Sequence, residues 1–244
     1  MPSRAEREDA RRRHAEQLRE QEPARRRRNR ALAAVGAVAA VALATAGVVT
    51  ALGGEEDDAP SAAEPSAAEP LQFDAAPAPG SSDATSAEIA TSSGGISVEL
   101  LPDAAPQAVA SFDLLAGEGF FDGTDCHRLV TSGIYVLQCG DPTGTGTGGP
   151  GYSFGPVENA PADDVYPAGT LAMARQGGDG DSNGSQFFLV YEDSTIPSDA
   201  AGGYTVFGRV TEGLDVVRTI AEGGNASDGV APATPISIEG VTTQ

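Results

Sequence analysis

The chain has 244 residues and a formal net charge of −20, and it contains no Lys. Eleven of its 15 basic residues lie in the first 30 positions, whereas the remainder carries four Arg against 29 of the 35 acidic residues. Because residues 31–244 are so acidic, the phosphate backbone of a nucleic acid is not expected as a partner. The length suffices for one domain with additional segments.

The N-terminal part predicts a membrane anchor. Residues 1–30 read as a basic cytoplasmic tail, and residues 31–54 contain no charged residue. At about 1.5 Å per residue, this run spans roughly 36 Å, enough to cross a bilayer core of about 30 Å. Because Arg precedes it, the positive-inside rule predicts a cytoplasmic N-terminus and an extracytoplasmic C-terminal part. Two alternatives are a signal peptide cleaved near Ala46, which would secrete the domain, and a buried soluble helix.

The next segment, residues 55–82, is rich in Ala, Pro, Ser and acidic residues and contains a short repeat between Pro60 and Pro70. Such a composition buries too little apolar surface to fold, so it predicts a disordered tether. Residues 83–244 then form the predicted folded domain.

Short strands and two helices are expected within this domain. Ala87–Thr91 and Ile96–Leu100 alternate apolar and polar residues around a Gly-Gly pair, which predicts a hairpin. Helical patterns begin at Pro106 and near Glu212, and residues 235–241 read as a closing strand. Many short strands with only two helices favour a mainly β fold, a closed antiparallel barrel with helices over its ends.

Two catalytic patterns fail on their context. The glycines at 144–149 fit a dinucleotide-binding motif, but Pro150-Gly151 follows at once, so no helix begins there. The Gly180–Gly184 stretch fits the nucleophile elbow of hydrolases, yet no His follows Ser182. Because the chain has two His and two Cys, a zinc site is not expected either, and we expect no metal and no cofactor.

A more specific set of motifs remains. In chain order it comprises Cys126-His-Arg-Leu-Val130, Gln138-Cys-Gly-Asp141, Gly169-Thr-Leu-Ala-Met-Ala174, Asn183-Gly-Ser-Gln-Phe-Phe188 and Tyr204-Thr-Val-Phe-Gly-Arg-Val210. From about residue 84 to 242 the chain resembles the cyclophilin family of peptidyl-prolyl cis-trans isomerases. The resemblance implies an eight-stranded antiparallel barrel capped by two helices, with a substrate groove on its outside.

The resemblance also implies roles for individual residues. Arg128 matches the catalytic arginine, and Gln138 matches the glutamine beside it. The implied substrate-binding residues are Tyr135, Val136, Ala174, Arg175, Gln186, Phe188, Ile196, Pro197 and Tyr204. Arg175 replaces a usual Asn, Tyr204 stands where many members have His, and the chain lacks the Trp that some members carry. His127 is expected to be structural, and residues 143–149 to form a tight loop beside the groove.

Cys126 and Cys139 flank the turn between two strands that pair in the family. In an oxidising exterior they could form a disulfide, and two buried thiols are the alternative. Closing a loop of about 14 residues would stabilise the domain by about 3 kcal/mol.

The implied activity needs no covalent step. Rotation about an X–Pro bond is opposed by amide resonance, and Arg128 could stabilise the twisted amide by donating hydrogen bonds. The expected partners are Pro-containing polypeptides that fold after export, together with the membrane contacted by residues 31–54. A second hypothesis is a cyclophilin-like module that binds Pro-containing segments as a chaperone or scaffold without turnover.

Overall fold

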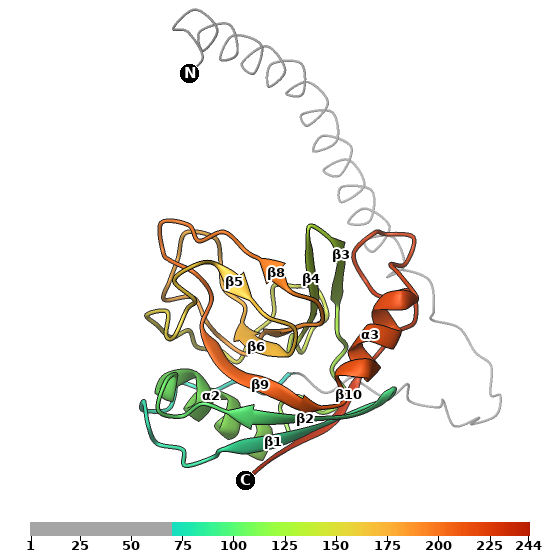
Figure 1. Ribbon diagram of the computed structural model, residues 1–244. Coiled ribbons are helices and arrows are strands. Elements are labelled where there is room, and N and C mark those ends of the chain that lie inside the picture. Colours follow the sequence, from blue (N-terminus) through green and yellow to red (C-terminus); the bar gives the residue numbers. More distant parts are fainter. Residues whose placement is uncertain (1–69) are drawn as a thin grey trace, which may run out of the picture. The chain divides into compact units, whose positions relative to one another are not determined.

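The computed structural model of the protein describes residues 70–244 (Figure 1). The predicted basic tail, the predicted membrane span at 31–54 and most of the predicted linker lie outside the described residues. Among the helices of residues 70–244, none is both long and apolar enough to cross a membrane.

The described chain is mainly β. Across the antiparallel eight-stranded sheet, the order is β10 (Ile238–Thr243), β1 (Ser86–Thr91), β2 (Gly94–Leu100), β9 (Val206–Glu212), β6 (Thr170–Met173), β7 (Phe187–Val190), β4 (Ile134–Cys139) and β3 (Arg128–Ser132). A two-stranded sheet pairs β5 (Val165–Tyr166) with β8 (Ser194–Thr195). The two helices are α2 (Pro106–Gly117) and α3 (Leu214–Glu222). The predicted hairpin and both predicted helices are therefore confirmed.

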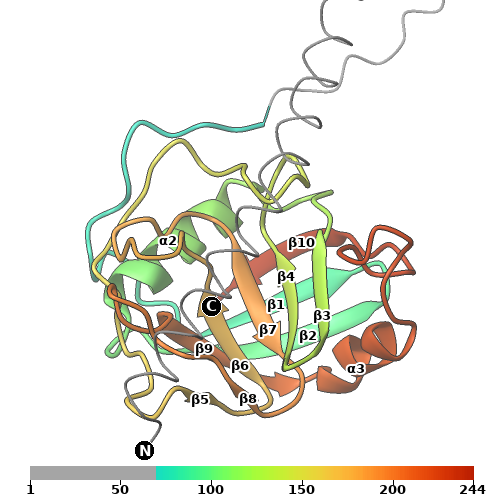
Figure 2. The same ribbon diagram turned by 90° about the horizontal axis from the view of Figure 1, so that it is seen from above.

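The sheet curls but differs from the predicted closed barrel, because β10 and β3 remain edge strands with no ladder between them (Figures 1 and 2). The edge of β3 that faces away from β4 forms hydrogen bonds with the loop that follows α3. Leu129 N–H donates to the Val230 carbonyl at 2.8 Å, and the Asn225 amide donates to the Leu129 carbonyl at 2.8 Å. Nearer β10, a single isolated bridge joins Asp125 to Ser237. The loop thus takes the hydrogen bonds that a closing strand would need.

The core lies inside the curl and is built from cross-strand rows. One row runs across β3, β4, β7 and β6 through Leu129, Leu137, Leu189 and Leu171, all of them at most 2% exposed. On β9 this row ends at Gly208, where a Cβ would approach the Glu99 carbonyl oxygen to 2.8 Å. A glycine is therefore required for β9 to pack at this distance from β2 and β6.

Helix α2 contributes its apolar residues to the same core. The Phe112 ring lies 5.2–5.6 Å from the rings of Phe121, Phe187 and Phe207, which are distances at which aromatic pairs attract. No side chain caps the helix locally. Instead the Glu158 carboxylate accepts hydrogen bonds from the backbone N–H groups of Gln107 and Ala108 at 3.1 and 3.0 Å. It satisfies two of the free donors at the helix N-terminus and complements the helix dipole.

Residues 70–82 differ from the prediction of a disordered tether up to residue 82. They run along the domain, past α2 (Figure 2). Phe73 is half-buried, with its ring 6.2 Å from Phe120 and 6.4 Å from Tyr152. Ser82 is buried, and the Gln107 amide donates to the Pro77 carbonyl at 2.8 Å. One aromatic side chain and a few backbone contacts thus order a segment whose composition alone predicts disorder. We call residues 70–82 the strap.

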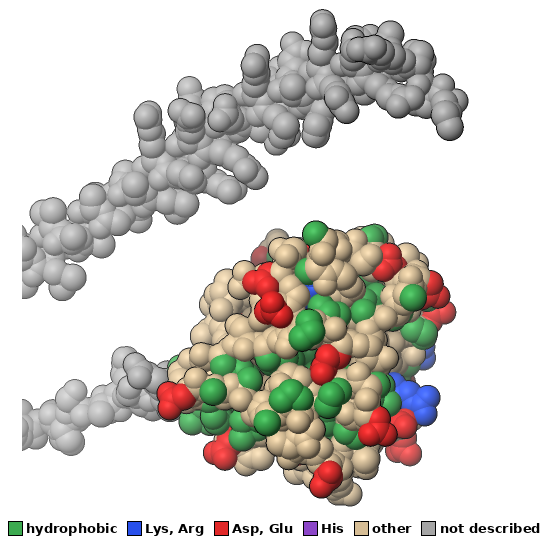
Figure 3. Space-filling model, turned by 90° about the vertical axis from the view of Figure 1, so that its left-hand side faces the viewer, with side chains coloured by type: hydrophobic (Ala, Val, Ile, Leu, Met, Phe, Trp, Pro, Cys, Tyr) green, Lys and Arg blue, Asp and Glu red, His purple; other side chains and the backbone are tan. Residues whose placement is uncertain are grey.

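The surface carries the acidity that the composition predicts. On the face shown in Figure 3, acidic side chains are scattered over the surface, and most of the basic surface lies at one edge. Of the four Arg residues in the described chain, Arg175 and Arg209 form ion pairs with Asp199 and Glu99, at 2.9 and 2.6 Å.

Candidate active site

The residues singled out by the sequence gather on the outer face of the curled sheet. Arg128 on β3 lies opposite Gln138 on β4, which lies opposite Phe188 on β7, which lies opposite Ala172 on β6. Because neighbours along a strand point to opposite faces, this row faces away from the Leu row of the core. We call it the Arg128 row. Sheet register alone thus brings Arg128, Gln138 and Phe188 together.

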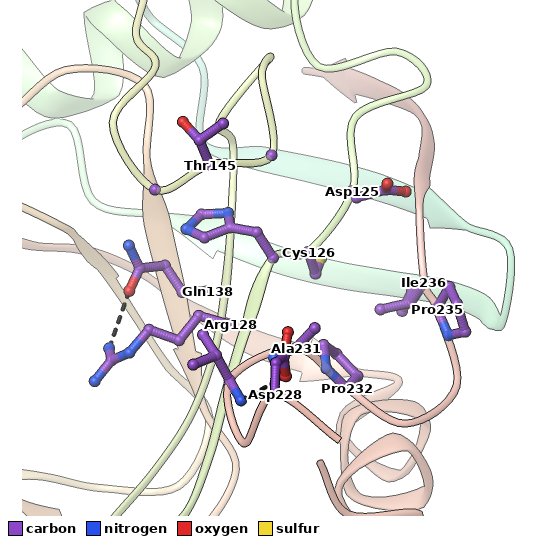
Figure 4. A pocket seen from close by; sticks show the side chains of 14 residues that line it. Asp125, Cys126, Arg128, Gln138, Thr145, Asp228, Ala231, Pro232, Pro235 and Ile236 are labelled. Atoms are coloured by element: carbon purple, nitrogen blue, oxygen red, sulfur yellow. Dashed lines mark hydrogen bonds between the residues drawn. The ribbon is translucent and has the colours of Figure 1, made fainter. Parts of the chain in front are cut away.

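A chain of hydrogen bonds extends from Arg128 along this face. Arg128 Nη1 donates to Gln138 Oε1 at 3.1 Å (Figure 4). Gln138 Nε2 donates to Gln186 Oε1 at 2.9 Å. Gln186 Nε2 in turn donates to the Gly148 carbonyl at 2.9 Å. We call this chain of contacts the amide relay. It fixes one Nη of the guanidinium, and within residues 70–244 the other side-chain donors of Arg128 have no hydrogen-bond partner.

A cavity of about 140 Å³ lies beside Arg128. Apolar and aromatic side chains form most of its wall and the polar side chains of Arg128, Gln138 and Arg175 the rest, and we call it the apolar cavity for short. Its lining comprises Arg128, Ile134, Val136, Gln138, Ala174, Arg175, Phe188, Ile196 and Tyr204. The Phe188 and Tyr204 rings meet edge to face at 5.5 Å and form one wall. A cavity of about 150 Å³ in another protein accommodates one benzene ring, so this one has the size for a single small ring.

Strand β4 places its residues differently from the resemblance. Val136 lines the apolar cavity as predicted, but Tyr135 points to the opposite face, and its ring lies 5.9 Å from Tyr191. Tyr135 instead lines a separate cavity with Arg218 and Glu222. Tyr135 therefore lies outside the cavity where the resemblance placed it, because odd and even positions of a strand cannot share a face. Ile134, two positions before Val136, completes the pocket wall and was missed.

The rim of the cavity is formed by the segment after β8. Ile196 is 8% exposed and lines the cavity, whereas the neighbouring Pro197 is exposed and is not part of its lining. Tyr204 is fixed through its backbone N–H, which donates to the Tyr166 hydroxyl at 2.8 Å. Ile196 and Tyr204 thus occupy the predicted pocket, and Pro197 does not.

Arg175 is held by contacts within the protein. Its Nε and both Nη atoms make five hydrogen bonds, to the Asp199 carboxylate and to the carbonyls of Gln176, Gly202 and Gly203. The guanidinium also lies 4.8 Å from the centre of the Tyr204 ring, and the side chain is 1% exposed. Hydrogen bonding from Arg175 holds the pKa of Asp199 well below its usual range. Because all five donors are used, Arg175 shapes the pocket wall and has no donor left for a bound chain.

Two larger cavities adjoin the apolar one. A cavity of about 490 Å³ is lined by Gln186, Ala174 and residues 146–150, and one of about 740 Å³ by Asp125, Asp228 and residues 230–232, among others (Figure 4). Gln138 lines all three cavities, and Arg128 lines the apolar and the largest one. The site is thus an extended groove with Arg128 and Gln138 at its centre, long enough for a polypeptide segment.

The Gly/Thr loop beside the groove is built around the fully buried Asp141. Its carboxylate accepts hydrogen bonds from the backbone N–H groups of Thr143, Gly146 and Gly148 and from the Thr143 hydroxyl, at 2.5–3.1 Å. Burial alone would raise the pKa of Asp141, but these hydrogen bonds outweigh it and lower the pKa. A Cβ at Gly148 would clash with Asp141 Oδ1, so glycine is required there. The run that resembles a dinucleotide motif is thus a loop wrapped around one carboxylate.

His127 and Cys126 line the largest of the three cavities. Among residues 70–244, neither buried ring nitrogen of His127 has a hydrogen-bond partner, and burial lowers the pKa of His127, which favours the neutral form. This environment suits the predicted structural role of His127. Cys126 and Cys139 are joined by a disulfide, which ties the start of β3 to the end of β4. The bridge thus closes the hairpin that carries Arg128 and Gln138.

Comparisons with known proteins agree with this architecture. A family model described as cyclophilin-type peptidyl-prolyl cis-trans isomerase matches residues 86–243. The probable peptidyl-prolyl cis-trans isomerase B of Mycobacterium leprae is 48% identical over 63% of this chain and 55% of its own length, so the chain spans about half of that relative. The peptidyl-prolyl cis-trans isomerase B of Bacillus subtilis is 44% identical over 52% of this chain and 84% of its own.

Solved structures of a cyclophilin-type isomerase from Cryptosporidium parvum have the same fold. One is 28% identical, with a TM-score of 0.57 over 66% of this chain and 98% of its own. A second, with a TM-score of 0.56 and 29% identity, was solved in the presence of the dipeptide Ala-Pro. From the motifs, the fold and these matches together, the chain belongs to the cyclophilin-type peptidyl-prolyl cis-trans isomerase family.

Proposed function

We propose that the domain catalyses cis-trans isomerisation of X–Pro bonds in polypeptides, with Arg128 and Gln138 at the catalytic centre. The observation that carries the proposal is one shared cavity: the guanidinium of Arg128 lines the same ring-sized pocket as Phe188. A proline ring held there would bring its amide within reach of the free donors of Arg128. The Cryptosporidium parvum structure with Ala-Pro supports a proline-containing ligand for this fold.

The chemistry follows from the amide bond. Resonance gives the X–Pro bond a rotation barrier of about 18–20 kcal/mol, and uncatalysed exchange takes tens of seconds or longer. Twisting the bond breaks the resonance and returns a lone pair to the prolyl nitrogen. A charge-assisted hydrogen bond from Arg128 to that nitrogen, or to the adjacent carbonyl oxygen, contributes about 1.5–3 kcal/mol, roughly 10- to 150-fold in rate. The pocket holds the ring while the preceding carbonyl rotates.

The two larger cavities are where we expect the substrate backbone to extend from the proline. Gln138 lines both of them, Gln186 and Ala174 line one, and Arg128 lines the other. Because the donors of Arg175 are already used, this side chain supports the pocket rather than the substrate backbone. Ile134, Val136, Phe188, Ile196 and Tyr204 are the apolar contacts that we assign to the proline ring.

An isomerisation assay without a coupled protease tests the proposal. Exchange of the cis and trans signals of a short X–Pro peptide is followed by NMR with the full wild-type chain and with Arg128→Ala. We expect the wild type to accelerate exchange, and Arg128→Ala to lower kcat/KM by about 10- to 150-fold. If both proteins exchange the peptide at the buffer rate while it still binds, the chain is a Pro-binding module without turnover.

We also propose that residues 31–54 anchor the protein as a single span, with the isomerase domain outside the membrane acting on newly exported chains. The support is the charge-free run after an Arg-rich segment. Carbonate extraction of membranes, with the mass of the recovered protein, tests this. A protein released as a chain beginning near Ala46 would instead indicate a cleaved signal peptide and secretion.

A further inference from the structure

The strap touches the loop that borders the groove. Phe73 N–H donates to the Pro150 carbonyl at 2.8 Å, and the Gln72 side-chain amide donates to the Gly149 carbonyl at 3.1 Å. Gly151 lies so close that a Cβ there would approach the Phe73 carbonyl oxygen to 2.8 Å. The Phe73 ring packs against Tyr152 and Phe120 and holds the strap in this place. Two consecutive strap residues thus bind two consecutive carbonyls of the loop.

The same loop carries the last acceptor of the amide relay. Gly148, immediately before Gly149, accepts the hydrogen bond from Gln186 that orients Gln138 and through it Arg128. From inside the domain, Asp141 holds the Gly148 N–H. From outside, the strap holds the next two carbonyls of the loop. The loop is therefore clamped from both sides at the point where the relay ends.

The other end of the strap is fixed away from the groove. There the Gln107 amide donates to the Pro77 carbonyl at 2.8 Å, and Gly80 N–H donates to the Pro106 carbonyl at 3.3 Å. Neither Gln107 nor Pro106 lines the three cavities around Gln138. The strap therefore has two sets of contacts, one with residues 149–151 beside the groove and one with Pro106 and Gln107 away from it.

We propose that Gln72 and Phe73 are positioning residues for the isomerase reaction, acting through the 148–151 loop and the amide relay on Arg128. The proposal rests on the proposed function. A small shift of the Gly148 carbonyl weakens its hydrogen bond with the Gln186 amide. Each side-chain amide in the relay keeps one orientation only while the hydrogen bonds on both of its sides are present. The segment that leads into the domain is thus part of its catalytic apparatus.

The test compares three forms of the full chain: wild type, the double variant Gln72→Ala/Phe73→Ala, and Gln107→Ala as the matched control. Two readouts are measured, kcat/KM for a proline peptide and the side-chain amide NMR signals of Gln138 and Gln186. A misplacement of about 1 Å in a catalytic site can cost up to about 100-fold in rate, so a loosened loop should lower kcat/KM by about 3- to 10-fold. We expect the double variant to show this loss and shifted amide signals.

The control separates positioning from a general loss of stability. Gln107→Ala also loosens the strap, so its melting temperature should fall, while its kcat/KM and both amide signals stay at the wild-type values. Restoring the ring by Gln72→Ala/Phe73→Tyr should recover most of the rate. The proposal is overturned if the double variant keeps wild-type kcat/KM and amide signals, or if Gln107→Ala loses as much activity as the double variant. Were the wild type itself inactive, the proposed function would fail, and the amide signals alone would decide whether the strap positions the relay.

Discussion

Two adjacent side chains of β4 should respond in opposite ways to truncation. Ile134 lines the apolar cavity, whereas Tyr135 faces away from it and packs against Tyr191. We therefore expect Ile134→Ala to lower activity with little effect on stability. Tyr135→Ala should lower stability with little effect on activity.

The size of each effect can be worked from the contacts. Ile134→Ala removes three carbon atoms, each contributing about 0.8 kcal/mol when fully covered. Because a wall residue contacts one side of the ring only, we take about half, or about 1.2 kcal/mol, which is roughly an eightfold loss of kcat/KM. Tyr135→Ala removes an edge-to-face pair and a half-buried ring, and should lower the free energy of unfolding by about 2 kcal/mol.

The measurements are kcat/KM from NMR exchange of a proline peptide and the free energy of unfolding from urea titration of the same variants. Val136→Ala, on the pocket face of the strand, should behave like Ile134→Ala in the activity assay. The reasoning would be refuted if Tyr135→Ala lowered kcat/KM as much as Ile134→Ala does. That result would mean that the face of β4 assigned to the pocket is the wrong one.

Three further predictions concern stability. The double variant Cys126→Ala/Cys139→Ala should have a free energy of unfolding about 3 kcal/mol lower than the wild type, because the disulfide closes a loop of about 14 residues. Urea titration of the variant, and of the wild type with and without reductant, measures this. Equal free energies of unfolding for variant and wild type would contradict it. Asp141→Ala should cost at least about 3 kcal/mol, since the buried carboxylate is the common acceptor of three backbone N–H groups that shape the loop. The same titration would count against this account if the variant stayed within 1 kcal/mol, on the order of one neutral hydrogen bond. The pKa of Asp199 is lower in the folded protein than the value of about 3.9 for an unfolded chain, so its ionised form stabilises the fold above about pH 4, and this contribution is lost as the pH falls further. Asp199→Asn should therefore flatten the pH dependence of the melting temperature below about pH 4. An unchanged profile would contradict the Arg175–Asp199 pairing as the cause.

Local sequence patterns correctly predicted the helices and strands that depend on residues close together in the chain. The two alternating runs pair as the β1–β2 hairpin, although its turn lies at Ser92-Ser93 and the Gly-Gly pair opens β2. Pro106 sets the start of α2. The resemblance brought Arg128, Gln138 and Phe188 to one site, and sheet register explains why they meet there. Each of these predictions depends on neighbours along the chain or on an ordered set of motifs.

Other features depend on contacts between distant segments. Tyr135 was placed in the pocket by counting along the motif, but the turn between β3 and β4 decides which face each β4 residue takes. Arg175 finds its partner Asp199 24 residues later, in a loop with no pattern of its own. The strap is ordered by Phe73, one ring within an otherwise featureless composition. In these cases the decisive partner lies far away in the sequence, so no local pattern could report it.

The alignment of the Arg128 row has a consequence for protein engineering. The row crosses β3, β4, β7 and β6 along one line of cross-strand pairs, so its geometry depends on ladder register. The turn at Gly133 sets that register for β3 and β4 and should keep its length. The connection between β6 and β7 lies outside the row, and a Cβ at Gly177 would meet open space. Gly177 is therefore the place to graft a peptide tag or a recognition loop onto the domain, as long as the strands that carry the row keep their pairing.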